Sequence, residues 1–119
     1  MVLRFMDREK NDHYYIEKIK TDLKFVIDHT NGKSTDEIES DELLIDSIMF
    51  RIIQISENNS KLSKQFVSSH KEVPWAAIKG MRNRIVHDYD GVNLSMIWGF
   101  LTTELDDLKK QIETILSKI

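Results

Sequence analysis

The stretch P-W-A-A-I-K-G-M-R-N-R-I-V-H-D-Y-D-G, residues 74–91, concentrates more polar chemistry than any other part of the chain. Pro74 suits the first turn of a helix, where its missing N–H has no intrahelical partner to lose. Asp90-Gly91 is a turn signal. The sequence therefore predicts a helix from near Pro74 to near Asp88, with arginines, an amide and an imidazole in its second half.

At about 100° per residue, this helix carries two different stripes. The first is apolar, recurs at helical spacing and predicts a core face: Ile78, Met81 and Ile85. The second combines very small residues with an amide and an imidazole: Ala76, Gly80, Asn83 and His87. Small residues let another backbone or a ligand approach closely, and Asn83 and His87 are spaced to hydrogen-bond.

Arg82 and His87 are five residues apart, so about 140° separates them on a regular helix. Arg82 can reach a group held by His87 only through its long side chain, through a distorted helix end, or in a site shared with a second copy of the chain. The alternative is purely structural. A histidine near a helix C-terminus often just interacts with the helix dipole, and Arg84 with Asp88 is expected to form a surface pair.

Length and composition limit the function. The 119 residues are expected to form one domain, residues 1–119, with a small core. The net charge of −3 excludes a broadly basic coat, so any RNA contact would be a local cleft. The chain has no cysteine, which excludes disulfides and thiolate metal sites. With neither a signal peptide nor a membrane span visible, we expect a cytoplasmic protein.

Apolar spacing and capping residues predict further helices. They run from Asp7 to Thr30, closed by Asn31-Gly32; from an N-cap at Ser40 to Asn58-Asn59-Ser60; and from Leu62 to Ser69. Residues 33–39 are expected to be a loop. The whole predicts an all-α fold without strands, an antiparallel bundle of four to five helices.

The last helix, capped by Asn93, carries a heptad seam: Leu94, Trp98, Leu101, Leu105, Leu108, Ile112, Ile115 and Ile119. Such a seam could form a coiled coil with another chain, but in a compact domain it more often lines its own bundle core, which we favour.

Metal and nucleotide motifs are missing from the sequence. A di-iron bundle needs Glu-x-x-His pairs, and the residues three before the histidines are Lys10, Val26, Val67 and Arg84. Glycine-rich phosphate loops are also absent. We therefore expect no cofactor and no metal. His13 and His29 are interpreted as solvent-exposed, and Trp75 and Trp98 as core anchors.

The pattern Arg82-Asn83-x-x-x-His87-x-Tyr89 resembles the R-x4-H-x-Y motif of the HepT-like toxins of the HEPN superfamily. The resemblance extends to Pro74-Trp75, Gly80-Met81 and the Trp98 helix, and covers nearly the whole chain. It implies a dimer with paired motifs in a shared cleft and metal-independent ribonuclease activity. It also implies a minimal nucleotidyltransferase antitoxin (MntA-like), as in type VII-like toxin–antitoxin pairs, that attaches AMP to Tyr89.

The residue types agree with RNA cleavage. RNA supplies its own nucleophile, the 2′-OH, so catalysis needs proton transfer and a cation for the phosphate charge. An imidazole suits the first task and a guanidinium the second, which gives His87 and Arg82 their expected roles. Asn83 would orient the ring or bind a phosphate oxygen. Lys79 and Arg84 are further candidates for contacts with RNA phosphates.

Two hypotheses stay open at this point. The chain is a ribonuclease toxin, or it is a non-catalytic HEPN-type domain that binds a nucleotide or its nucleotidyltransferase partner. Arg82 and His87 together favour the first. For Tyr89, the alternative to modification is a tyrosine that packs under the turn, although its acidic flanks and Gly91 favour an accessible hydroxyl.

Overall fold

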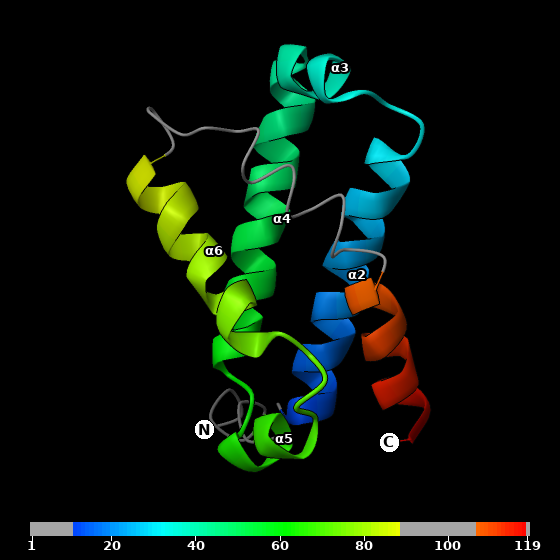
Figure 1. The fold of residues 1–119 in the computed structure, drawn as a ribbon, viewed down its shortest axis with the longest axis vertical. Coiled ribbons are helices and arrows are strands. Elements are labelled where there is room, and N and C mark those ends of the chain that lie inside the picture. Colours follow the sequence, from blue (N-terminus) through cyan, green and yellow to red (C-terminus); the bar gives the residue numbers. More distant parts are fainter. Residues whose placement is uncertain (1–10, 89–106, 119) are drawn as a thin grey trace, which may run out of the picture.

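The structure, a computed structural model, describes residues 11–88 and 107–118, with the backbone alone at residues 84 and 86–88. The regular elements in these ranges are all helices: α2 (Asp12–Thr30), α3 (Thr35–Ser40), α4 (Glu42–Ser60), α5 (Lys64–Ser69), α6 (Trp75–Asp88) and a helix over residues 107–118. Successive long helices run in opposite directions (Figure 1). The predicted all-α antiparallel bundle is confirmed.

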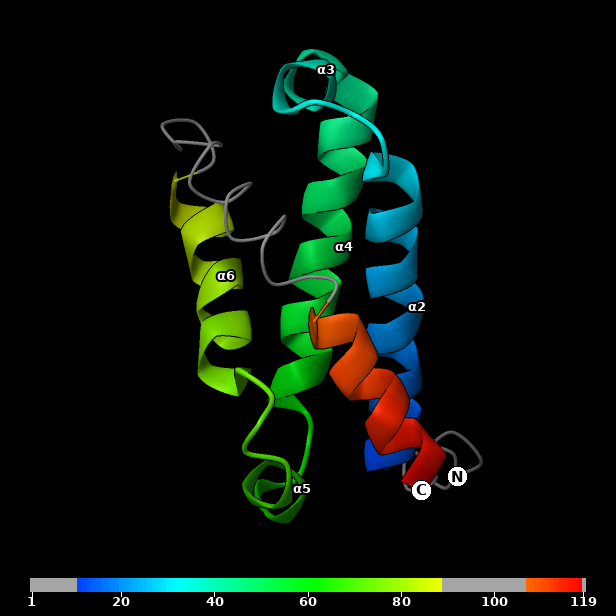
Figure 2. The same cartoon turned by 45° about the vertical axis from the view of Figure 1, so that its right-hand side comes forward.

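Helix α4 is the centre of this arrangement. It lies between α2 and α6 in both views (Figures 1 and 2), with α3 at one of its ends and α5 at the other. Its isoleucines explain this position, because Ile45, Ile48, Ile52 and Ile55 are all buried. A helix so rich in apolar residues is stable only when neighbouring helices cover it.

Capping residues set the bounds of the helices. The Asn11 side chain caps the start of α2 by accepting from the Tyr14 N–H at 3.2 Å. The same helix ends at Asn31, followed by Gly32 with a φ of 76°, a left-handed conformation that glycine adopts without a steric penalty. This confirms the predicted end at Asn31-Gly32. The predicted start at Asp7 falls among residues 1–10, outside the described residues.

Two sequence predictions for the next segment are wrong. Residues 33–39 are not a loop throughout, because α3 begins at Thr35: Ser34 and Glu37 form a reciprocal capping box at its start, and Ile38 anchors this short helix in the core. Ser40 is not the N-cap of the following helix, since it ends α3. Asp41 is the cap of α4, and its carboxylate accepts from the Leu44 N–H at 3.1 Å. The polar composition of this segment concealed both features.

The short helix α5 also begins later than predicted. Ser63 caps it by accepting from the Phe66 N–H at 3.1 Å, so the helix starts at Lys64. Leu62 precedes the helix and is buried, as expected for an inward-facing residue. Asp12 of α2 accepts from both the backbone N–H and the hydroxyl of Ser63, which joins the start of α5 to the start of α2.

The core joins all four long helices. Most of its buried apolar residues come from α2, α4, α6 and residues 107–118: Ile16, Ile19, Leu23, Val26, Ile45, Ile48, Met49, Ile52, Ile55, Trp75, Ile78, Ile85, Leu108, Ile112 and Ile115. Three points of the sequence analysis are thereby confirmed: the core face of α6, the anchoring role of Trp75, and, over residues 107–118, the packing of the last helix into its own bundle.

Part of the predicted last helix lies outside the described residues, namely its N-cap at Asn93, the seam positions Leu94, Trp98, Leu101 and Leu105, and Ile119. Within the described ranges, no helix is long and apolar enough to cross a membrane.

Candidate functional site

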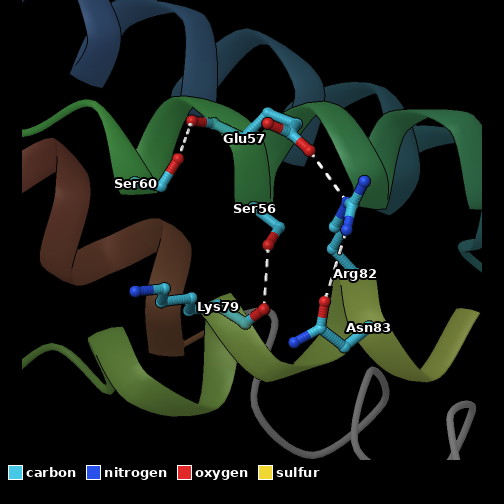
Figure 3. A pocket seen from close by; sticks show the side chains of 6 residues that line it. All are labelled: Ser56, Glu57, Ser60, Lys79, Arg82 and Asn83. Carbon is cyan, nitrogen blue, oxygen red and sulfur yellow. Dashed lines mark hydrogen bonds and ion pairs between the residues drawn. The ribbon is translucent and has the colours of Figure 1, made fainter. Parts of the chain in front are cut away.

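An open cleft of about 340 Å³ lies between α4 and α6. It is lined by polar and charged side chains from the two helices, which Figure 3 shows facing one another: Ser56, Glu57, Ser60, Lys79, Arg82 and Asn83. Three of these residues, Lys79, Arg82 and Asn83, were candidates from the sequence. The cleft therefore brings them together with a group of residues from α4 that sequence analysis had not selected.

Two buried polar side chains of α4 fix the position of α6. The Ser56 hydroxyl donates to the Lys79 carbonyl oxygen at 3.1 Å, and the Asn59 amide donates to the Trp75 carbonyl oxygen at 3.0 Å. These two carbonyls are one turn apart on α6. Because buried polar groups are costly without a partner, this pair of bonds favours one register of α6 along α4.

Arg82 is held at the lip of the cleft by a carboxylate. Its Nε lies 2.9 Å from Oε1 of Glu57, across the gap between the two helices (Figure 3). One terminal nitrogen, Nη1, makes a longer contact of 3.4 Å with Oδ1 of Asn83. A guanidinium has five N–H groups, so most of them remain without a partner among the described residues. The Arg82 side chain is 44% exposed, so these groups can reach a ligand in the cleft.

The other candidate residues are less closely placed. Lys79 lines the cleft, but its ammonium group points away from Arg82 (Figure 3). Arg84 lies two positions past Arg82, about 200° around the helix. His87 lies in the last turn of α6, which stays α-helical through Asp88, so the separation of about 140° from Arg82 applies. The side chains of Arg84 and His87, and all of Tyr89, lie outside the described residues.

Sequence analysis missed Glu57, and with it Ser56 and Asn59. The segment Asn58-Asn59-Ser60 was interpreted only as the end of a helix, and α4 does end at Ser60. A signal was present, however. Ser56 and Asn59 are three residues apart and continue the buried stripe of Ile52 and Ile55. Polar residues on a buried stripe require partners, and here the partners belong to α6.

Histidines elsewhere in the described chain are accounted for locally. His13 and His29 are exposed, as predicted. The His29 ring stacks on Phe25 with centroids 4.0 Å apart, and Nε2 of His13 lies 3.7 Å from Glu17. Among the described residues, no three His, Cys, Asp or Glu side chains are grouped so that they could hold a metal ion.

Comparison with known proteins agrees with the motif. The family model described as Ribonuclease HepT-like matches residues 19–115. "Putative RNase TTE0752" of Caldanaerobacter subterraneus subsp. tengcongensis is 34% identical over 109 residues, which cover 92% of this chain and 97% of that protein. "Probable ribonuclease HepT" of Thermococcus cleftensis is 23% identical over 110 residues, covering 92% and 98% of the two chains.

A third relative is "Putative RNase MJ0127" of Methanocaldococcus jannaschii, which is 26% identical over 111 residues, covering 93% of this chain and 92% of that protein. No solved structure matches the chain. The family model spans most of the chain, including α6 and its Arg82-to-His87 motif. The chain therefore belongs to the HepT-like ribonuclease family.

Proposed function

We propose that this protein is a metal-independent endoribonuclease, and that it is the toxin of a toxin–antitoxin pair. The observation that carries the proposal is Arg82, a guanidinium anchored by Glu57 at 2.9 Å on the lip of an open polar cleft. Most of its N–H groups have no partner among the described residues, and a guanidinium matches the geometry of a phosphate. The relatives named as ribonucleases support the choice of RNA.

The proposed reaction uses the 2′-OH of RNA as the nucleophile. A base takes the 2′-OH proton, and the oxygen attacks the adjacent phosphorus. The bond from phosphorus to the 5′-oxygen breaks, and an acid returns a proton to that oxygen. The products are a 2′,3′-cyclic phosphate and a 5′-OH. His87 is the proton-transfer group and Arg82 stabilises the charge that develops on the phosphate oxygens. Asn83 binds a phosphate oxygen or orients the imidazole.

The two proton transfers favour a homodimer, since one copy of the motif supplies one histidine. A two-fold arrangement would bring two sets of Arg82 and His87 into one cleft, using the same surface on both copies. The small-residue stripe on α6 is compatible with close approach: Ala76 and Gly80 are exposed, and a Cβ added at Gly80 would meet nothing within 4 Å. A strict monomer in light scattering at micromolar concentration would contradict this part of the proposal.

Cleavage of an RNA oligonucleotide in the presence of EDTA tests the activity. We expect the wild type to produce 2′,3′-cyclic phosphate ends. Arg82→Ala and His87→Ala should each lower the rate by about 10²–10³-fold, without changing the circular dichroism spectrum. His13→Ala, which removes an exposed histidine of α2, is the matched control and should cleave normally.

Two results would contradict the proposal: cleavage that EDTA abolishes, or cleavage that survives His87→Ala. Binding of RNA or a nucleotide by the wild type without any cleavage would instead favour the non-catalytic binding domain.

We further propose that a cognate nucleotidyltransferase antitoxin silences the enzyme by attaching AMP to Tyr89. Each AMP unit adds a negative phosphodiester and a bulky base two residues from His87, where both would compete with incoming RNA. Intact-mass spectrometry after incubation with the antitoxin, ATP and Mg²⁺ should show added AMP on the wild type and none on Tyr89→Phe. Equal labelling of the two proteins, or no labelling of the wild type, would rule out this site.

A further inference from the structure

We propose that Glu57 is a positioning residue that holds the guanidinium of Arg82 in the orientation needed to receive a phosphate. The inference rests on the proposed ribonuclease function and adds to it a residue of α4 outside the sequence motif. Glu57 is not proposed to touch the substrate. Its role is to act through Arg82, so its removal should affect catalysis without affecting the fold.

Glu57 contacts Arg82 at Nε, which leaves the two terminal nitrogens of the guanidinium for a phosphate. Glu57 Oε1 lies 2.9 Å from Nε, the nitrogen nearest the backbone of Arg82. An arginine bound there keeps its two terminal nitrogens, the pair that can bind two oxygens of one phosphate. The other contact of the guanidinium, from Nη1 to Asn83, is long at 3.4 Å and therefore weak. Among the described residues, Glu57 is thus the charged group in closest contact with the guanidinium.

The backbone that carries the carboxylate is itself held in place. Glu57 lies between Ser56 and Asn59, the two buried residues that bond to the Lys79 and Trp75 carbonyl oxygens of α6. These bonds set how far α6 lies along α4, and they do so within one turn of Glu57. The distance between the backbones at Glu57 and Arg82 is therefore fixed by buried contacts, and a small error in position at a reacting group can cost about 10²-fold in rate.

Exposure argues against a role in stability. The side chains of Glu57 and Arg82 are 42% and 44% exposed. Pairs with this much exposure contribute little to folding, because water screens the charges and ordering two long side chains costs entropy. A negative charge beside a phosphate site also repels RNA. A carboxylate at this position is therefore unfavourable for RNA binding and nearly neutral for the free energy of folding. Orientation of the Arg82 guanidinium is the remaining contribution that Glu57 can make to catalysis.

The decisive comparison is Glu57→Gln with Glu57→Ala. Glutamine keeps the length of the Glu57 side chain and an oxygen close to Nε of Arg82, whereas alanine keeps neither. If Glu57 positions Arg82, Glu57→Ala should lower kcat by about 10–100-fold with a much smaller change in KM, and Glu57→Gln should keep most of the activity. Both variants should unfold at the wild-type urea concentration. Glu17→Gln removes the same charge from a carboxylate on α2 that is 50% exposed, and should behave as the wild type.

Other roles predict other results. If Glu57 itself transferred a proton, Glu57→Gln would lose as much activity as Glu57→Ala. If only its charge mattered, both variants would lower KM alike and leave kcat unchanged. A positioning residue should also have no effect once its target is gone, so Glu57→Ala added to Arg82→Ala should cause no further loss. A full additional loss in that background would overturn the proposal.

A measurement independent of cleavage separates this inference from the proposed function. The NMR signal of the Arg82 Nε–H, identified by its disappearance in Arg82→Lys, should exchange slowly with water in the wild type and in Glu57→Gln, and quickly in Glu57→Ala. Equal exchange in the wild type and in Glu57→Ala would overturn the inference even for an active enzyme. If instead the wild type fails to cleave RNA while the signal stays protected, the ribonuclease proposal fails and the contact stands.

Discussion

Among the described residues, two arginine–carboxylate pairs join α4 to its neighbours, one on each side. Toward α2, Nη1 of Arg51 donates to Oδ1 of Asp22 at 2.7 Å, and its guanidinium lies over the Phe25 ring at 4.1 Å. Toward α6, Glu57 contacts Nε of Arg82 at 2.9 Å. The carboxylates differ most in exposure: the Asp22 side chain is 10% exposed and that of Glu57 is 42% exposed. The arginines are closer, at 32% for Arg51 and 44% for Arg82.

The difference shows how surroundings assign different tasks to the same two functional groups. Asp22 is buried, so Arg51 is needed to balance its charge, and the Phe25 ring covers the guanidinium. That pair holds α2 and α4 together. The Arg82 pair borders an open cleft, where water screens it and a ligand can reach it. The arginine that pairs with a buried carboxylate is structural, and the arginine that borders the cleft is available for chemistry.

Removing each arginine in turn should separate stability from activity. Arg51→Ala leaves the buried Asp22 without its partner and should lower the free energy of unfolding by about 2–4 kcal/mol, somewhat less than for a fully buried pair because Arg51 reaches water. Arg82→Ala should change it by less than about 0.5 kcal/mol, while lowering the cleavage rate by about 10²–10³-fold. Urea unfolding followed by circular dichroism measures both.

The comparison would fail in either of two ways. Destabilisation by Arg82→Ala as large as that by Arg51→Ala would mean that the cleft pair is also structural. An Arg51→Ala protein that stays folded but loses its activity would mean that the α2 side takes part in the reaction.

The bonds that set the register of α6 should have a smaller effect. Ser56→Ala removes the buried hydroxyl that donates to the Lys79 carbonyl oxygen at 3.1 Å, and should lower stability by about 0.5–1.5 kcal/mol. Ser60→Ala is the matched control, since Ser60 is exposed and its hydroxyl donates only within α4, to the Glu57 carbonyl oxygen. Equal effects of the two changes in urea unfolding would show that the bond between the helices contributes nothing specific.

Local features of the chain could be predicted well. The long helices, the end of α2 at Asn31-Gly32 and the core face of α6 follow from spacing and capping within a few residues. Helix α3 was missed because its segment is polar apart from Ile38, which is the residue that it buries in the core. There the capping box of Ser34 and Glu37 was the signal, and it outweighed the low hydrophobicity.

The site was only half predictable for a physical reason. Arg82 and Asn83 are local to one motif, whereas Glu57 meets Arg82 only after α4 and α6 have packed. Ser56 and Asn59 could have indicated that packing, because they are polar positions on a buried stripe. Nothing local in the sequence specifies which carboxylate faces which arginine, and the same holds for Asp22 and Arg51.

The smallest expected effect is at Gly80, on the exposed small-residue stripe of α6. In a helix interior, glycine is less favourable than alanine by about 0.5–1 kcal/mol, and a Cβ at Gly80 would meet nothing within 4 Å. Gly80→Ala should therefore stabilise the protomer by about 0.4–1 kcal/mol in urea unfolding. The packing of the described residues gives no reason for glycine here, and close approach by a second copy or by RNA would give one.

Light scattering over a range of concentrations distinguishes these reasons. If α6 pairs with itself, Gly80→Leu should weaken the dimer, and Gly80→Ala should weaken it slightly despite a more stable protomer. Ala77→Leu is the control, because Ala77 is also exposed on α6 but lies off the stripe, about 100° from Ala76. A dimer that tolerates Gly80→Leu as well as Ala77→Leu would show that the open side of α6 is reserved for the substrate.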